Sequence, residues 1–149
     1  KITYHDFTEI IYGNILELIE KSVERISEII NDEEYPITAV EEALANALVH
    51  RDYLDMTRGV SVLITDRTIE IINPGAIAGG SKVYLNMKGW APPRRNAWLY
   101  QRLITIDEKR RFMRTGMGIC RIRKALDMTG AVKFINLGKQ NTFKVVLPR

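Results

Sequence analysis

The feature that most constrains the fold is a helical segment, residues 39–51, that is apolar on nearly every side. A helix of this kind must be covered by other elements, because it has almost no polar side to expose to water. Three polar residues interrupt it at four-residue intervals: Glu42, Asn46 and His50. At about 100° per residue, Asn46 and His50 lie about 40° and about 80° around the helix from Glu42. We therefore expect a buried helix that carries one polar line.

The polar line has two interpretations, a solvent-facing side or the wall of a pocket. The residues that we expect in the core, opposite or beside the line, are Val40, Ala43, Leu44 and Ala47. The residues that flank the line, where a solvated side normally carries Lys, Glu or Gln, are Ala39, Ala45 and Val49. Polar groups on a buried helix need partners, so the line is suited to a cavity that holds water, a metal or a ligand. From the residues alone, neither interpretation outweighs the other.

The three residue types on the line limit the chemistry that it can perform. A carboxylate such as Glu42 can take a proton from water as a general base. An amide oxygen such as that of Asn46 is a hard ligand suited to Mg²⁺, which keeps water molecules and binds phosphate oxygens. This pair indicates phosphoryl chemistry. His50 is either a third pocket residue or, as we favour, a structural hydrogen-bonding group.

The other patterns along the chain predict further helices and two pairs of strands. Residues 6–30 read as one long amphipathic helix with Asp6 as its N-cap, in an N-terminal segment that covers 1–34. Thr38 and Glu41 form a capping-box pattern at the start of the apolar helix. The other expected elements are strands at 59–65 and 68–73 with a turn at 66–67, a helix near 96–104, a helix at 119–129 closed by Gly130, and strands at 131–137 and 142–147. These elements predict one domain, 1–149, of the α+β class: a two-layer α/β sandwich with a mixed, mostly antiparallel sheet covered on one face by helices.

Composition and charge limit the class of protein further. Of the 149 residues, 46% are apolar and 27% are charged, which is enough apolar residues to bury a core. A single cysteine, Cys120, excludes an internal disulfide and fits a cytoplasmic protein. No apolar run approaches the roughly 20 residues of a membrane span, so no membrane is expected as a partner. The net charge is +4, with basic clusters at 92–96 and 109–124, which suit either a phosphate-bearing partner or an ordinary solvated surface.

Two glycine-containing elements could bring backbone close to a ligand. "TGMG" at 115–118 follows Arg114 and precedes a helix, so its backbone N–H groups could face an anion, although the same pattern is common as a plain turn. "NPG" at 73–75 ends a strand, and Asn73 could meet a base or a sugar, although the residues alone favour a β-turn. The segment 76–114 is long and irregular, which is typical of a functional or mobile segment.

Taken together, these segments resemble the ATP-binding C-terminal domain of RecG-helicase-related transcriptional regulators. The resemblance covers about residues 35–149, and it rests on "YPITAVEEALANALVHRDY", "TIEIINPGAI", "RRNAWL", "RTGMGICRI" and "TFKVVL". The first of these segments is the most specific. The family belongs to the GHKL class of ATPases, with DNA gyrase, the MutL repair proteins and the histidine kinases. The resemblance implies a Bergerat-type fold, in which a nucleotide lies between the helices and the sheet.

The resemblance also implies roles for residues at the phosphate end of such a site. Glu42 matches the catalytic carboxylate that polarises the attacking water, and Asn46 matches the Asn that binds Mg²⁺. Gly116 and Gly118 match the second glycine box, which lies beneath the phosphates. Arg114, next to that box, is a further expected nucleotide-binding residue.

At the base end, the resemblance assigns Asn73 and Gly75 to the first glycine box and Thr142 to a late strand position near the base. His50 is included as a pocket residue because of its place on the polar line, and 76–114 matches the ATP lid. The chain departs from the class at this end. Asn73, followed by a proline, replaces the Asp that normally binds the adenine amino group, and Ile77 replaces the second glycine of the box.

We therefore expect a Mg-ATP-binding regulatory module of a DNA-associated transcriptional regulator, with slow or no ATP hydrolysis. No Walker A or helicase motor motif is present, and no lysine trigger for hydrolysis is identifiable. The chain starts at Lys1 and is expected to be a fragment, with DNA bound by another, N-terminal domain of the Schlafen or Alba type. One alternative is a degenerate module without nucleotide that forms a homodimer through the 6–30 helix. Another is direct nucleic-acid binding through the arginines of 92–124.

Overall fold

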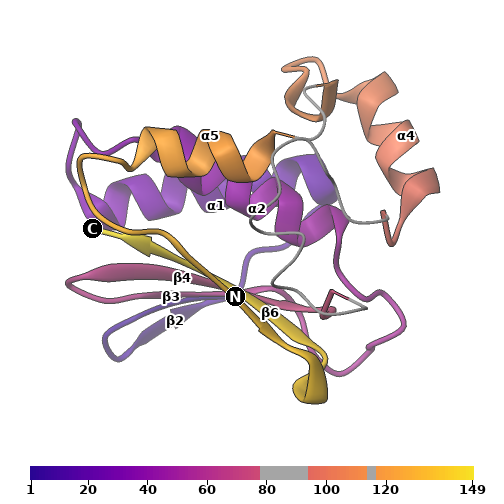
Figure 1. Cartoon of the computed structure of the whole chain (residues 1–149), viewed down its shortest axis with the longest axis horizontal. Coiled ribbons are helices and arrows are strands. Elements are labelled where there is room, and N and C mark those ends of the chain that lie inside the picture. Colours follow the sequence, from indigo (N-terminus) through magenta and orange to yellow (C-terminus); the bar gives the residue numbers. More distant parts are fainter. Residues whose placement is uncertain (78–93, 114–116) are drawn as a thin grey trace.

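The computed structural model of the chain contains a six-stranded sheet with helices packed over one of its faces (Figure 1). It describes residues 1–77, 94–113 and 117–149. The strands are β1 (Ile2–Tyr4), β2 (Phe7–Glu9), β3 (Ser61–Ile64), β4 (Thr68–Pro74), β5 (Lys133–Leu137) and β6 (Thr142–Pro148). The helices are α1 (Ile15–Ile30), α2 (Ile37–Val49), α4 (Ala97–Ile106) and α5 (Gly118–Ala125), with two 3-10 turns, η1 (Arg111–Met113) and η2 (Gly138–Gln140). Helices α1, α2 and α5 lie over the sheet, whereas α4 projects at one end of the molecule (Figure 1).

The order of the strands is β2-β1-β3-β4-β6-β5. Only β1 and β3 pair in parallel among the described strands, and the other neighbours are antiparallel. The expected α/β sandwich with a mixed, mostly antiparallel sheet is thus confirmed. The expected hairpin at 66–67 is also present, since the Thr65 N–H donates to the Thr68 carbonyl oxygen at 2.8 Å.

The core lies between α2 and the inner face of the sheet. Antiparallel pairing aligns Ile69, Ile71 and Asn73 of β4 with residues 147, 145 and 143 of β6, and all three β4 side chains are buried. The expected core residues of α2 are buried: Val40, Ala43, Leu44 and Ala47. The apolar residues that flank the polar line are buried as well: Ala39, Ala45 and Val49. This helix is therefore covered on nearly every side, as its composition requires.

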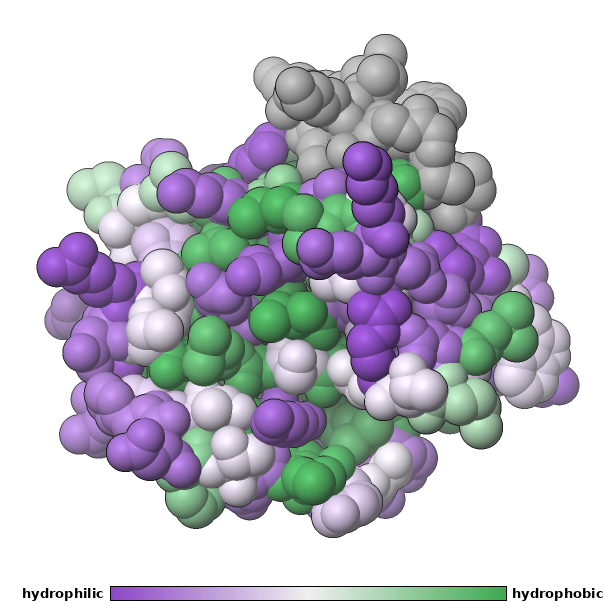
Figure 2. Space-filling view, turned by 90° about the horizontal axis from the view of Figure 1, so that it is seen from below, coloured by the Kyte–Doolittle hydropathy of each residue, from purple (hydrophilic) through white to green (hydrophobic). Residues whose placement is uncertain are grey.

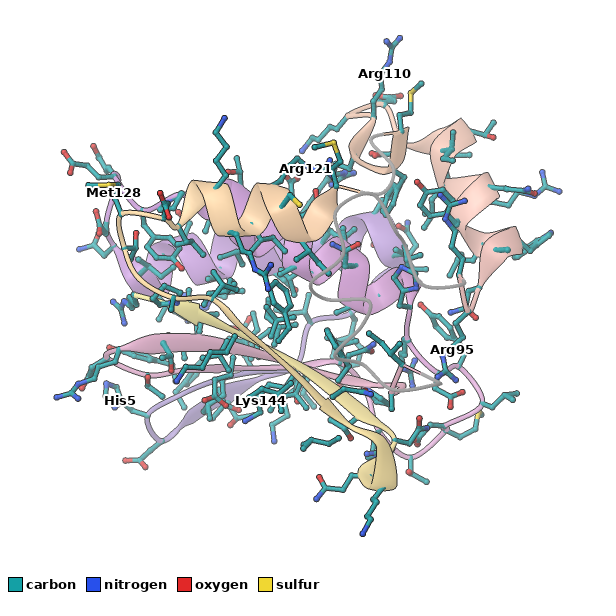
Figure 3. All side chains as sticks on the ribbon, in the orientation of Figure 1. His5, Arg95, Arg110, Arg121, Met128 and Lys144 are labelled. Carbon is teal, nitrogen blue, oxygen red and sulfur yellow. The ribbon has the colours of Figure 1, made fainter. Side chains whose placement is uncertain are left out.

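The opposite face of the sheet mixes hydrophobic and hydrophilic residues (Figure 2). Lys144 lies on this side, away from the helices (Figure 3), and its Nζ pairs with Glu70 Oε2 at 2.7 Å. Alternation along β6 explains the difference between the two faces, because successive side chains of a strand point to opposite sides.

The expected helix over 6–30 is wrong in its first part. Residues 2–4 and 7–9 are strands, and α1 begins only at Ile15. The N-cap is Asn14, whose Oδ1 accepts hydrogen bonds from the next turn at 3.0 and 3.1 Å, and not Asp6. Gly13 adopts a φ of +149°, which a helix does not tolerate. The pairing of β1 with β3 then stabilises an extended conformation that no local pattern indicates.

The ends of two other helices also differ from expectation. Helix α2 starts at Ile37 after Pro36, without any side-chain capping bond, so the capping box at Thr38 is wrong. Proline fixes φ near the helical value, which lets the helix begin before Thr38. Helix α5 ends at Ala125. Gly130 closes the turn that follows, donating its N–H to the Leu126 carbonyl oxygen at 3.0 Å.

Candidate functional site

The start of α5 packs directly against two residues of the polar line. A Cβ atom built on Gly118 would lie 2.9 Å from Asn46 Nδ2 and 3.3 Å from Glu42 Cδ, and closer still to Glu42 Oε1. Real Cβ atoms do not approach other groups so closely, so only glycine allows this contact. Along residues 39–49, Glu42 and Asn46 are half-buried together with Glu41, and the others are buried. Three residues predicted to share a site are therefore neighbours in the fold.

Both carboxylate oxygens of Glu42 accept hydrogen bonds. Asn46 Nδ2 donates to Oε1 at 3.0 Å. Arg121, on α5, donates to Oε2 from Nη2 at 2.8 Å and from Nε at 3.1 Å. The side chains of Glu42 and Arg121 are 20% and 30% exposed, so water screens this ion pair only in part. The pair therefore ties α2 to α5 beside Asn46.

Sequence reasoning missed Arg121 as a site residue, although it lies in the predicted basic cluster. One signal could have found it. Arg121 follows Gly118 by three residues, and residues three apart share one side of a helix. If Gly118 packs against Glu42, a residue on the same side of α5 must also lie near Glu42.

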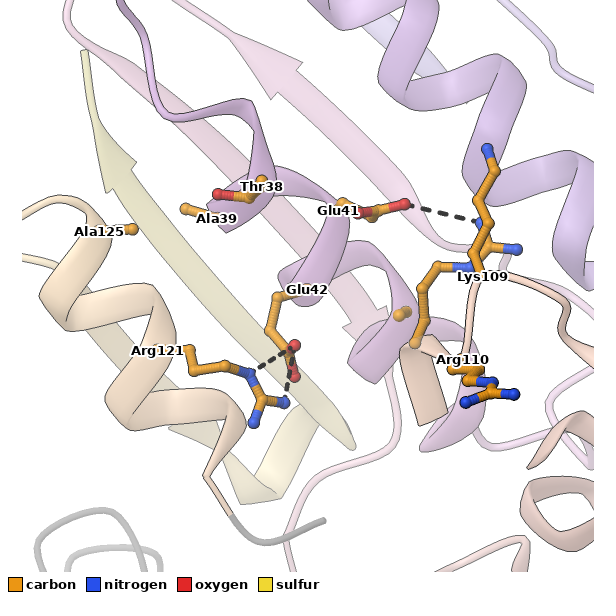
Figure 4. Close-up of a pocket in the computed structure, with 10 residues that line it drawn as sticks. Thr38, Ala39, Glu41, Glu42, Lys109, Arg110, Arg121 and Ala125 are labelled. Atoms are coloured by element: carbon orange, nitrogen blue, oxygen red, sulfur yellow. Dashed lines mark hydrogen bonds and ion pairs between the residues drawn. The ribbon is translucent and has the colours of Figure 1, made fainter. Parts of the chain in front are cut away.

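A cavity of about 330 Å³ lies beside this ion pair, between α2, α5 and residues 109–111 (Figure 4). The alanines of α2 and α5 that line the cavity are too small to fill it. The charged residues that line it are Glu41, Glu42, Lys109, Arg110, Arg111 and Arg121. Four cationic side chains outnumber two carboxylates, so the cavity is suited to an anion.

The wall of the cavity at 109–111 is held by a buried ion pair. Asp107 accepts hydrogen bonds from the Arg111 N–H at 2.6 Å, from Nη2 at 2.6 Å and from Nε at 3.0 Å. Burial alone would raise the pKa of Asp107, but these hydrogen bonds and the charge of Arg111 outweigh it and lower the pKa. Arg111 also lies 3.6 Å from Glu41 Oε1, which ties the wall to α2.

At the other end of the site, Asn73 is buried on the inner face of β4. Its exposed fraction is 3%, and its Oδ1 accepts no hydrogen bond from the described residues. Most buried polar atoms have a partner, so an unsatisfied amide oxygen is notable. Asn73 and Pro74 both remain within β4, so the interpretation of 73–75 as a plain β-turn is wrong.

Gly75 follows β4 in a conformation that favours glycine. Its φ is +129°, and a Cβ there would lie 3.0 Å from both the Asp52 nitrogen and the His50 carbonyl oxygen. Its N–H donates to the Asn141 carbonyl oxygen at 2.8 Å. The glycine thus lets the end of β4 pack against the backbone that leaves α2.

A network of side chains that sequence reasoning missed fastens this end of β4. Asn136 binds the backbone of Ile77 twice, at 2.9 and 3.0 Å. Asn141 accepts from the Ala76 N–H at 3.0 Å and donates to Asp52 Oδ2 at 2.8 Å. The bond from Asn141 is the main reason that the pKa of Asp52 is lowered. Asn141 has a positive φ of 45° at the turn before β6, a conformation that favours Asn. An Asn in the expected turn was therefore the one sequence signal for this network.

Arg95 joins the same network near the end of the sheet (Figure 3). Its Nη1 lies 3.2 Å from Asp52 Oδ2, and its Nη2 donates to the Ala76 carbonyl oxygen at 2.8 Å. The neighbouring Asn96 donates from Nδ2 to the carbonyl oxygens of Val49 and Arg51, both at 2.8 Å. The described part of the expected lid is thereby bound to the end of α2.

His50 ends the polar line next to this network. Its side chain forms no hydrogen bond with any described residue, so the favoured role as a structural hydrogen-bonding group is not seen there. Burial lowers the pKa of His50, and the charges of Arg94 and Arg95 lower it further. The imidazole is therefore neutral at pH 7.

The remaining predicted site residues are not brought together with these. Thr142 pairs with Pro74, one residue along from Asn73, so alternation places it on the opposite face of the sheet. Its Oγ1 accepts from Arg58 Nη1 at 2.9 Å and donates to the Gln140 carbonyl oxygen at 3.0 Å. Arg114 and Gly116 lie outside the described residues, as do residues 78–93 of the expected lid.

Several arginines of the predicted basic cluster have partners within the chain. Arg94 stacks over Tyr100 at 3.9 Å from the ring centroid, and Arg123 over Phe134 at 5.3 Å. Together with the ion pairs of Arg95, Arg111 and Arg121 described above, these contacts mean that much of the cluster stabilises the fold.

No protein-family model and no curated protein matches the chain. Among solved structures, it is similar to the crystal structure of the DIP2311 protein from Corynebacterium diphtheriae, with a TM-score of 0.69 and 20% sequence identity. The match covers 99% of this chain and 32% of that protein, so the chain spans about a third of its length. At this identity the similarity shows a shared fold. Within the described residues, no helix is both long and apolar enough to cross a membrane.

Proposed function

We propose that the chain is a Mg-ATP-binding regulatory module, of the Bergerat type, in a DNA-associated transcriptional regulator. The observation that carries the proposal is the contact of Gly118 with Glu42 and Asn46. It joins a carboxylate and an amide on one helix to the glycine-containing start of another. Backbone that can come close to an anion and a hard oxygen ligand serve to bind Mg²⁺ and phosphate, and a general base serves hydrolysis.

The residues present fit Mg²⁺ bound together with phosphate. Asn46 uses its Nδ2 to hold Glu42, which leaves its amide oxygen to face a cation. No group of three or more His, Cys, Asp or Glu residues in the described part of the chain could form a metal cage. Mg²⁺ commonly binds through one or two protein oxygens, with water and phosphate oxygens completing its shell. When bound, it neutralises phosphate charge.

The base of the nucleotide would lie near Asn73. The buried Oδ1 of Asn73 has no donor among the described residues, and the exocyclic amino group of adenine would supply one. An amide can also donate from Nδ2 to a ring nitrogen, which a carboxylate cannot do. Asn73 in place of Asp therefore remains compatible with adenine.

Hydrolysis in this module is slow at most, because no lysine trigger for hydrolysis is identifiable in the sequence. In the reaction, the water oxygen bonds to the terminal phosphorus and Glu42 accepts the water proton. The bond between that phosphorus and the bridging oxygen breaks, which releases ADP and phosphate. The module then acts mainly as a switch, whose bound nucleotide alters contacts with a partner. DNA is bound by another domain of the full-length protein.

Isothermal titration with Mg-ATP and, separately, with Mg-GTP tests the proposal. We expect heat of binding with Mg-ATP, its loss with Asn46→Ala, and retained binding without turnover for Glu42→Ala. Circular dichroism must show that each variant is folded. A folded wild-type chain that gives no heat with either nucleotide would refute the proposal.

A second candidate, a degenerate module that binds partners without nucleotide, is favoured by one observation. The Arg121 ion pair already satisfies Glu42 without a ligand. Light scattering with and without ATP separates the two functions. A dimer that forms independently of ATP, in a chain that binds no nucleotide, supports the second candidate.

A further inference from the structure

The ion pair between Glu42 and Arg121 joins the proposed general base to a cation on the cavity wall. Arg121 Nη2 lies 2.8 Å from Glu42 Oε2, and both side chains line the cavity of about 330 Å³ (Figure 4). Arg121 stands one helical turn after Gly118, where the phosphates of the proposed nucleotide would approach. The same guanidinium can therefore face either the carboxylate or an incoming phosphate.

The other cations of the cavity wall are less suited to this exchange. Arg111 is committed to Asp107 by three hydrogen bonds, and Lys109 Nζ lies 3.0 Å from Glu20. Arg110 is exposed and contacts neither carboxylate of the wall in any described interaction. Arg121 alone, of the described cations, contacts the proposed base.

We propose that Arg121 senses the terminal phosphate of the nucleotide by exchanging Glu42 for phosphate oxygens. This inference rests on the proposed function. A terminal phosphate carries more negative charge than a carboxylate and presents oxygens that match the planar guanidinium, so it competes for Arg121. Glu42 keeps the hydrogen bond from Asn46 and becomes free to accept a proton from water. Binding of a triphosphate thus unmasks the base, and the free chain holds it in a masked state.

The exchange has a consequence that a purely structural ion pair lacks. Glu42 competes with the phosphate for Arg121, so removing its charge should tighten the binding of a triphosphate. A structural ion pair predicts the opposite, since Glu42→Gln would then loosen the contact of α2 with α5 and weaken binding. The effect must also depend on Arg121, because without the guanidinium there is nothing to compete for.

The test is a double-mutant cycle measured by isothermal titration with Mg²⁺ and either a non-hydrolysable ATP analogue or ADP. We expect Glu42→Gln to tighten the analogue about tenfold and Arg121→Gln to weaken it about tenfold, with ADP changed less than about twofold. In the double variant, Glu42→Gln should no longer tighten binding. Arg123→Gln is the matched control, because it removes the same charge from α5 at a residue that stacks on Phe134. This control should leave the preference for triphosphate unchanged.

The outcomes separate the two proposals. If the wild-type chain binds neither nucleotide, the proposed function itself fails. If it binds the analogue, but Glu42→Gln weakens binding or acts equally with and without Arg121, only the sensing role is overturned. Should Arg121→Gln not fold, Arg121→Lys replaces it, since Lys keeps the charge without the fork. A smaller preference for triphosphate over ADP in that variant supports sensing, and an unchanged preference overturns it.

Discussion

Replacing Gly118 by alanine tests the contact on which the candidate site depends. The added Cβ would meet Glu42 and Asn46 at distances that folded proteins do not show, so their side chains must move. Glu42 is flexible and can turn toward solvent, but doing so breaks its hydrogen bonds with Asn46 and Arg121. Gly118→Ala should therefore lower both the stability of the domain and its affinity for nucleotide.

The size of the stability effect follows from the bonds that are lost. Hydrogen bonds to charged groups contribute about 1.5–3 kcal/mol each when buried, and much less when solvent screens them. Glu42 and Arg121 are 20% and 30% exposed, so partial screening reduces their loss to about 1–2 kcal/mol. Alanine has a higher helix propensity than glycine at the first position of α5, which adds at most about 1 kcal/mol to the free energy of unfolding. The net destabilisation is then about 0.5–1 kcal/mol.

Gly138→Ala is the matched control. No atom lies within 4 Å of a Cβ at Gly138, and its φ is not positive, so alanine there should be neutral or stabilise by about 0.4–1 kcal/mol. Urea unfolding followed by circular dichroism should place Gly118→Ala about 0.5–2 kcal/mol below Gly138→Ala. Titration with Mg-ATP should show a loss of affinity for Gly118→Ala only. Equal stability and equal affinity of the two variants would refute the close contact.

Two further changes test the end of α2. Asn96→Ala removes two hydrogen bonds of 2.8 Å to the carbonyl oxygens of Val49 and Arg51, and we expect a loss of about 1–2 kcal/mol in urea unfolding. A loss below about 0.3 kcal/mol would contradict the role of Asn96 in fastening α4. For His50, burial and two nearby arginines lower the pKa in the folded chain. As the pH falls through the ordinary histidine pKa of about 6.5, His50 therefore takes up a proton in the unfolded chain before it does so in the folded chain. Stability should fall more steeply between about pH 7 and about pH 5.5 in the wild type than in His50→Gln, and parallel curves would count against this assignment.

The parts of the fold that local patterns specify were predicted from the sequence. The apolar composition of 39–51 predicted a buried helix, and alternating residues predicted the strands of both hairpins. Strands β1 and β2 were missed because each has only three residues, too few for a period to be visible. Strand β1 pairs with β3, which lies far along the chain, and β2 pairs only with β1 among the described strands. The break in the expected helix lies at Gly13, whose φ is +149°.

The candidate site likewise contains residues that the sequence indicated and residues that it did not. Residue type, spacing and the family resemblance singled out Glu42, Asn46 and Gly118, and the structure brings these three residues together. Arg121 was missed because spacing alone shows only that it shares a side of α5 with Gly118, and the packing of α5 against α2 is what brings that side to Glu42. The bonds of Asn136 and Asn141 to the backbone after β4 have no sequence period at all.

The polar line on α2 runs between two different environments. Eight residues separate Glu42 from His50, which corresponds to about 12 Å along a helix. At the Glu42 end, the neighbours are the start of α5 and a cationic cavity. At the His50 end, the neighbour is Gly75, two residues after the unsatisfied amide of Asn73. One elongated ligand, with charge at one end and hydrogen-bond donors at the other, would contact both ends of the polar line at once. A nucleotide has that form, so the proposed nucleotide site would explain a single polar line on a helix that is otherwise apolar.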